Sequence, residues 1–163
     1  MDMRKLRLRT YTLMISVLLW GVLLGGVVYS HMVFFPVYLS NLPDSAAVVN
    51  GPYGLNEARF WLTIHPLLVL SLVIALIANW RERTKRFLIG STLIVYLVVL
   101  VVSALFFVPE LIAFHDSPIT AGDWQPRADR WWNLSLLRGT TLFIFAIPLL
   151  FARARSEASN GGN

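Results

Sequence analysis

The chain has 163 residues, of which 56% are hydrophobic, and this composition is too apolar for a small soluble domain. It contains no cysteine, which excludes disulfides, thiolate metal ligands and cysteine nucleophiles. The net charge of +5 comes from basic residues that flank apolar segments. Charge in these positions reflects membrane topology and contact with anionic lipid headgroups, so nucleic acid is not an expected partner.

Four apolar runs follow one another along the chain, at about 11–35, 59–80, 87–108 and 131–152. Each approaches or exceeds the length that a helix needs to cross the hydrocarbon of a bilayer. Unbroken runs such as LIVYLVVLVVSALFFV lack the alternation of a barrel strand. The sequence therefore predicts an all-α integral membrane protein: a four-helix bundle, antiparallel and up-down-up-down, in which 1–152 form a single domain. The first run is longer than a signal-peptide core and no cleavage-site pattern follows it, so it is expected to remain as a membrane helix.

Most basic residues fall at one end of the predicted helices. Ten of the fourteen Lys and Arg residues lie there: Arg4, Lys5, Arg7, Arg9, Arg81, Arg83, Lys85, Arg86, Arg153 and Arg155. The positive-inside rule predicts a multi-pass protein of the cell membrane with both termini in the cytoplasm. Residues 153–163 are expected to form a cytoplasmic disordered tail, and two long loops, 36–58 and 109–130, to lie on the outer side. No internal repeat is visible, which does not favour an inverted-repeat transporter.

Arg138 is the one basic residue inside a predicted span, within the stretch RWWNLSLLRGTTLF. A charged side chain at this depth is costly, and it normally faces the bundle interior with a partner. Three alternatives follow from this position. The guanidinium can extend along its stem to the outer surface, form an internal salt bridge with Glu110 or Glu57, or bind an anionic ligand or cofactor group.

All three histidines are predicted near the outer ends of the helices, His31 on the first, His65 on the second and His115 just after the third. By helical rise, His65 and Arg138 lie at similar heights. On the third helix, polar residues recur every seven positions and are expected to share a face: Tyr96, Ser103 and Glu110. The sequence therefore predicts a polar pocket that opens to the outside.

Several chemistries suit these residue types. His31, His65 and His115 are candidate ligands of a transition metal such as Cu, Fe or Zn. Alternatively, His31 and His65 are axial ligands of haem b, with Arg138 pairing a propionate. Without a cofactor, His65 or His31 can act as a base on a lipophilic substrate while Arg138 stabilises an oxyanion, with Glu110 as a partner. The spacing of the histidines matches no metal motif.

Two stretches carry a resemblance to a known family. VVYSHMVFFPVYLSNLP resembles the first-helix segment of the anthrone-oxygenase-like family of small four-span membrane proteins, in which a helix ends at a proline before an outer loop. DRWWNLSLLRGTTLF is similar to the Trp–Asn–Arg pattern that opens the last helix of that family, with Trp131 or Trp132, Asn133 and Arg138 at the matching positions. The resemblance implies a four-helix layout and an oxygenase that acts on polycyclic phenolic substrates.

Two functions of different class are therefore expected. The first is a small membrane oxidoreductase, oxygenase-like, whose lipophilic substrate enters between the helices and which uses His31, His65 and Arg138 with Glu110. The second is a non-catalytic accessory subunit of a larger membrane complex. Gly21-x-x-x-Gly25 in the first helix permits close helix approach, so a homo-oligomer is a further expectation alongside contact with membrane lipids.

Overall fold

The computed structural model describes residues 3–50, 52–116 and 124–158, which are helical or irregular and include no strand. The first long helix comprises α1 (Met3–Tyr29), a π-helical segment η1 (Ser30–Phe34) and α2 (Phe35–Tyr38), and a 3₁₀ helix η2 (Asp44–Val48) follows it. The second is α3 (Ala58–Ala78). The third comprises α4 (Arg83–Val102), a π-helical segment η3 (Ser103–Phe107) and α5 (Val108–Asp116), and the fourth is α6 (Trp124–Ala158). This confirms the all-α four-helix prediction.

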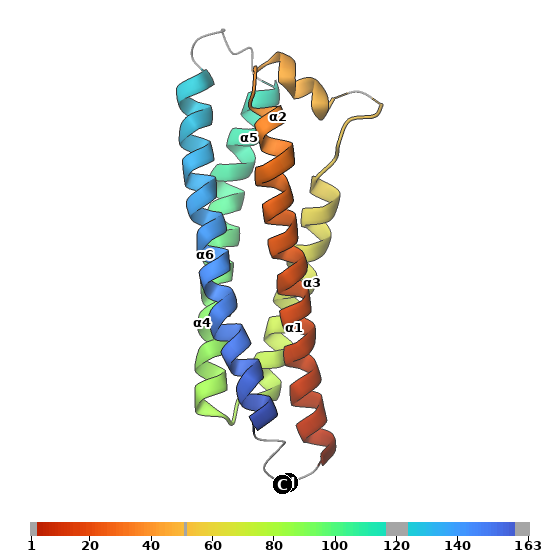
Figure 1. Cartoon of the computed structure of the whole chain (residues 1–163), viewed down its shortest axis with the longest axis vertical. Coiled ribbons are helices and arrows are strands. Elements are labelled where there is room, and N and C mark those ends of the chain that lie inside the picture. Colours follow the sequence, from red (N-terminus) through yellow and green to blue (C-terminus); the bar gives the residue numbers. More distant parts are fainter. Residues whose placement is uncertain (1–2, 51, 117–123, 159–163) are drawn as a thin grey trace.

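The four long helices form a closed ring of neighbours. Contacts join α1 to α3, α3 to α4, α4 to α6 and α6 back to α1. In Figure 1 the chain ascends through α1 and α4 and descends through α3 and α6, so α1 begins and α6 ends at the bottom of the view. All four helices are long and apolar enough to cross a membrane, so the protein is a multi-pass membrane protein.

Helix bounds differ from the apolar runs at both ends of the bundle. The third helix continues to Asp116 and the fourth begins at Trp124, so the link between them is much shorter than the expected loop 109–130. The fourth helix also runs to Ala158, into the segment expected to be a disordered tail, and residues 159–163 lie outside the described part. Polar residues continue a helix beyond the hydrocarbon without a hydropathy signal, which explains the difference.

Apolar side chains fill the bundle and also cover its outer surface. At the basic end the interior includes Leu13, Leu23, Leu68 and Leu72, none of which has exposed surface. Toward the opposite end a second buried cluster is rich in aromatic residues, among them Phe34, Phe35, Tyr38, Phe107, Phe114 and Trp131. The outward-facing residues are also large and apolar, for example Leu62, Phe87 and Leu105, which matches a surface that faces lipid.

Within the bundle, close helix approach involves other glycines than Gly21 and Gly25. A Cβ added at Gly21 or Gly25 would meet nothing within 4 Å, so neither glycine brings helices of this bundle together. A Cβ at Gly26 would instead overlap the Phe60 ring of α3. At Gly139 a Cβ would lie 3.2 Å from a methyl group of Val27, so this glycine allows α6 to approach α1 immediately beside Arg138.

A short repeat underlies the two π-helical segments, although none was predicted. The segments Ser30–Pro36 and Ser103–Pro109 share the pattern S-x-x-x-F-x-P, and each contains a π turn closed by a bond to the serine carbonyl oxygen. Proline has no N–H to donate and its ring crowds the preceding turn, so a locally wider turn accommodates it within a continuing helix. Since α1 and α4 run in the same direction, the repeat is parallel rather than inverted.

Candidate functional site

Arg138 lies half-buried between α6 and the third helix. Its Nη1 donates to Ser103 Oγ at 3.2 Å, its Nη2 donates to Ser135 Oγ at 3.1 Å, and its Cζ lies 4.2 Å from the centroid of the Phe107 ring. Across the described residues, no carboxylate lies within ion-pair distance of this guanidinium. These two hydrogen bonds use two of the five N–H donors of an arginine, so the cation keeps donor capacity for an anionic group.

Hydrogen bonds link Arg138 through Ser135 to His31. His31 Nδ1 lies 2.8 Å from the Val27 carbonyl oxygen, which can only accept, so Nδ1 carries a proton. When His31 is neutral, its Nε2 accepts from Ser135 Oγ at 3.1 Å, and Ser135 in turn accepts from Arg138. Ser135 has no exposed surface, so its hydroxyl transmits polarisation between the two side chains and is not placed to attack a substrate.

A second polar group lies on the neighbouring pair of helices. Ser30 Oγ donates to Glu57 Oε1 at 2.9 Å, and Trp61 Nε1 lies 3.5 Å from Glu57 Oε2. Partial burial raises the pKa of Glu57 above its usual value of 4.5, while the hydrogen bonds from Ser30 and Trp61 and the charge of His31 oppose that rise. Glu57 precedes α3, so this carboxyl group sits at the end of the bundle opposite the α3–α4 link.

His65 is paired with Tyr96 deeper in the bundle. Its Nδ1 lies 2.7 Å from the Tyr96 hydroxyl oxygen, and its ring stacks against Trp61 with centroids 5.5 Å apart. His65 also lies within electrostatic range of Arg138, which agrees with the predicted similarity in height. Nε2 has no hydrogen-bond partner in the described part of the chain, so this atom is available to a ligand.

Glu110 lies apart from this network. Glu110 accepts from Arg127 Nε at 2.8 Å, so the expected salt bridge between Glu110 and Arg138 is not formed. The seven-residue spacing assumed a regular helix, whereas the wider turn of η3 lies between Ser103 and Glu110 and changes the register of every residue after it. His115 is in the last turn of α5, and its side chain lies outside the described part.

An aromatic pocket opens beside His31. It has a volume of about 270 Å³ and is lined by Phe35, Pro36, Leu39, Trp124, Gln125, Ala128, Asp129 and Trp132. The His31 ring contacts two lining residues, with centroid distances of 5.4 Å to Phe35 and 5.5 Å to Trp132. The polar lining groups include the Gln125 amide and the Asp129 carboxylate, so the mouth of the pocket disfavours an anionic ligand.

Ser135 and the pocket residues Trp124 and Trp132 were not predicted as site residues. Ser135 stands three positions before Arg138 on α6, a spacing that places both side chains on one face and that could have identified it. Serine is also common in membrane helices, so the spacing alone is a weak signal.

No group of three His, Asp or Glu side chains gathers among the described residues. Both nitrogens of His31 already have hydrogen-bond partners, and His65 is paired with a tyrosine. The described side chains therefore give no support for the metal or haem predictions. The chain matches no protein-family model, no curated protein and no solved structure.

Proposed function

We propose that this membrane protein binds a lipophilic molecule with an acidic hydroxyl group and acts on it as an oxygenase-like oxidoreductase. The observation that carries the proposal is Arg138, a half-buried cation held by two hydroxyl groups and an aromatic ring with no carboxylate partner among the described residues. Such a cation stabilises negative charge that develops on a ligand oxygen.

The roles of the other groups follow from their positions. A flat ligand enters the pocket lined by Phe35 and Trp132, whose rings contact the His31 ring. His65, whose Nε2 has no hydrogen-bond partner among the described residues, accepts the hydroxyl proton, and Arg138 stabilises the oxyanion. Deprotonation makes an aromatic ring electron-rich and therefore more reactive toward dioxygen, which is the oxidant. One oxygen atom forms a carbonyl group at a ring carbon in place of its hydrogen, and the other leaves as water with that hydrogen and the hydroxyl proton, so that phenol and O₂ give quinone and H₂O. The resemblance to the anthrone-oxygenase-like family supports a polycyclic phenol as the substrate class.

Binding of 1-naphthol, with naphthalene as the matched ligand without a hydroxyl, tests the proposal. We expect 1-naphthol to quench tryptophan fluorescence of the purified protein, and Arg138→Gln to weaken its binding by about tenfold or more because a charge-assisted hydrogen bond is lost. Naphthalene binding should not change in this variant. Arg130→Gln, which removes an exposed arginine of the same helix, is the matched control.

Thermal melts of the variants separate binding from folding. Removing an unpaired half-buried charge should leave the melting temperature of Arg138→Gln equal to that of wild type or higher. Oxygen consumption with the phenol, together with an absorption spectrum and metal analysis, then tests the reaction class. The proposal would be contradicted if Arg138→Gln weakened the binding of 1-naphthol and naphthalene equally, or if wild type bound the two ligands with the same affinity.

A further inference from the structure

A second cavity lies at the opposite end of the bundle, on the outside of the hairpin formed by α3 and α4. This lateral groove has a volume of about 640 Å³, within the range of small-molecule sites. Its apolar part is lined by Leu76 of α3 and by Phe87, Gly90 and Ile94 of α4. A Cβ added at Gly90 would meet only Leu76, at 3.8 Å, so the missing side chain leaves the groove open along its length.

The end of the lateral groove that is nearest the α3–α4 link is basic. It is lined by Arg83, Arg86, Thr84 and Trp80. Arg83 forms no hydrogen bond or ion pair with the described residues, and the guanidinium of Arg86 rests on the Trp80 ring, 5.1 Å from its centroid. Trp80 is more than half exposed, as expected for a tryptophan at the level of lipid headgroups.

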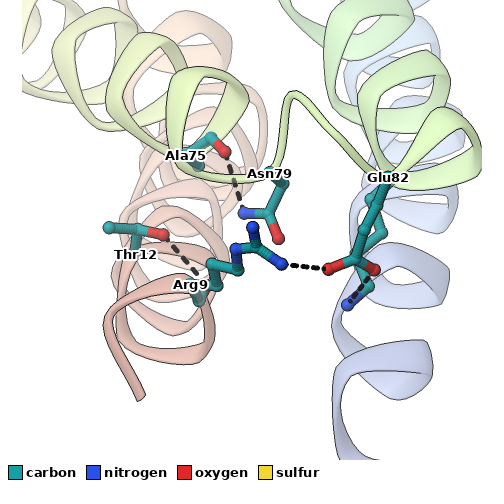
Figure 2. Close-up of polar contacts among 6 residues, drawn as sticks. Arg9, Thr12, Ala75, Asn79 and Glu82 are labelled. Atoms are coloured by element: carbon teal, nitrogen blue, oxygen red, sulfur yellow. Dashed lines mark hydrogen bonds and ion pairs between the residues drawn. The ribbon is translucent and has the colours of Figure 1, made fainter. Parts of the chain in front are cut away.

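The nearby carboxylate does not neutralise these arginines. Figure 2 shows Glu82 directed toward Arg9 of α1, and its two oxygens are occupied on the inner side of the link. Arg9 Nη1 lies 3.0 Å from Glu82 Oε1, and Lys85 Nζ lies 2.7 Å from Glu82 Oε2. Lys85 is buried and faces inward with Glu82. The positive charges of Arg83 and Arg86 therefore face the lateral groove without compensation from Glu82.

We propose that the lateral groove is a binding site for an anionic phospholipid. An acyl chain lies against Leu76, Gly90 and Ile94, and the headgroup phosphate is bound by Arg83 and Arg86, with the Thr84 hydroxyl as a further donor. The observations that favour this occupant are an apolar channel that ends at two guanidinium groups without a carboxylate partner among the described residues, and a tryptophan at the junction. Basic pockets between membrane helices bind anionic headgroups by this chemistry. The inference is independent of the proposed function.

Native mass spectrometry of the purified protein with added lipid tests the site. Phosphatidylglycerol and phosphatidylcholine with the same acyl chains are the probes. We expect wild type to retain phosphatidylglycerol at about tenfold lower concentration than phosphatidylcholine, since each arginine near an anionic headgroup contributes to binding. Arg83→Gln with Arg86→Gln should abolish that preference. Gly90→Leu should reduce retention of both lipids because it fills the channel.

Matched controls separate a specific site from general effects. The pair Arg81→Gln and Arg155→Gln removes the same charge from exposed positions at the same end, and Gly21→Leu adds the same side chain to an open position on α1. Both should behave as wild type. The proposal is overturned if the control pair lowers the preference as much as Arg83→Gln with Arg86→Gln, or if Gly90→Leu retains lipid normally. Displacement of the lipid by inorganic phosphate at a concentration equal to that of the lipid would also overturn it, since the acyl chain would then contribute nothing to binding.

Discussion

At the residue scale, the polar side chains of the half that contains η1 and η3 divide into a cationic and an acidic part. Arg138 and its two serines belong to the third and fourth helices, whereas Glu57, Ser30 and Trp61 lie at the adjoining ends of the first and second. His31 touches both parts, through its hydrogen bond to Ser135 and its electrostatic interaction with Glu57. His31 therefore links the two parts electrostatically.

Glu57 makes the stability of the protein depend on pH. Its pKa is raised in the folded protein, so above pH 4.5 the unfolded chain loses this proton before the folded one does. Stability should therefore fall as pH rises from 4.5 and level off above the folded pKa. Glu57→Gln removes this contribution and should flatten the dependence of the melting temperature on pH in detergent.

Ser30→Ala should change the dependence of the melting temperature on pH in the opposite direction to Glu57→Gln. The Ser30 hydroxyl favours the ionised carboxyl group, so its removal should raise the pKa of Glu57 further and extend the decline in stability to higher pH. The same pH dependence in wild type and Glu57→Gln would show that Glu57 does not cause it.

At the scale of elements, the two π-helical segments position the site. Both begin at a serine that supplies a hydroxyl to the polar network, Ser30 to Glu57 and Ser103 to Arg138. Each segment also contains a buried phenylalanine four residues after its serine, and one of these, Phe107, lies against the guanidinium of Arg138. Widened turns of this kind recur at functional sites, where they shift the register of the residues that follow.

Close packing of α1 on α3 depends on Gly26, and a neighbouring pair of variants tests it. In Gly26→Ala the new methyl group would overlap the Phe60 ring, so we expect a loss of about 1–3 kcal/mol in the free energy of unfolding. Gly25→Ala places the same methyl group in open space and should be neutral or slightly stabilising. Unfolding in mixed detergent measures both. Equal effects of the two substitutions would mean that helix propensity, and not contact with Phe60, decides.

Much of the fold was accessible from the sequence, because lipid requires long uninterrupted apolar helices and their lengths can be counted. The height of Arg138 was also predictable, since helical rise places it near Ser103, and the structure joins the two. Glu110 was misplaced because a constant helical period was assumed across η3. The sequence does not distinguish the glycines that contact a neighbouring helix, Gly26 and Gly139, from those that do not, Gly21 and Gly25. Only the packed helices show which glycines face a neighbour.

At the scale of the whole molecule, the orientation in the membrane, with the basic end in the cytoplasm, remains a prediction. It can be tested with single introduced cysteines, because the chain contains none of its own. Single cysteines at Ser40, beyond the end of α2, and at Ala154, near the end of α6, are exposed and lie at opposite ends of the bundle. We expect a membrane-impermeant maleimide to label Ser40→Cys in intact cells and Ala154→Cys only after permeabilisation, since basic ends stay cytoplasmic. The opposite labelling pattern would place the aromatic pocket on the cytoplasmic side.

The parallel repeat has a consequence for ligand selectivity. Ser30 and Ser103 occupy equivalent places in the two halves, yet the first faces a carboxyl group and the second a guanidinium. A bundle of two identical hairpins would offer a ligand two equal ways of binding. Here the halves differ in charge, so a molecule with one acidic end would bind in a single orientation, and an oxidation at this site would be regioselective.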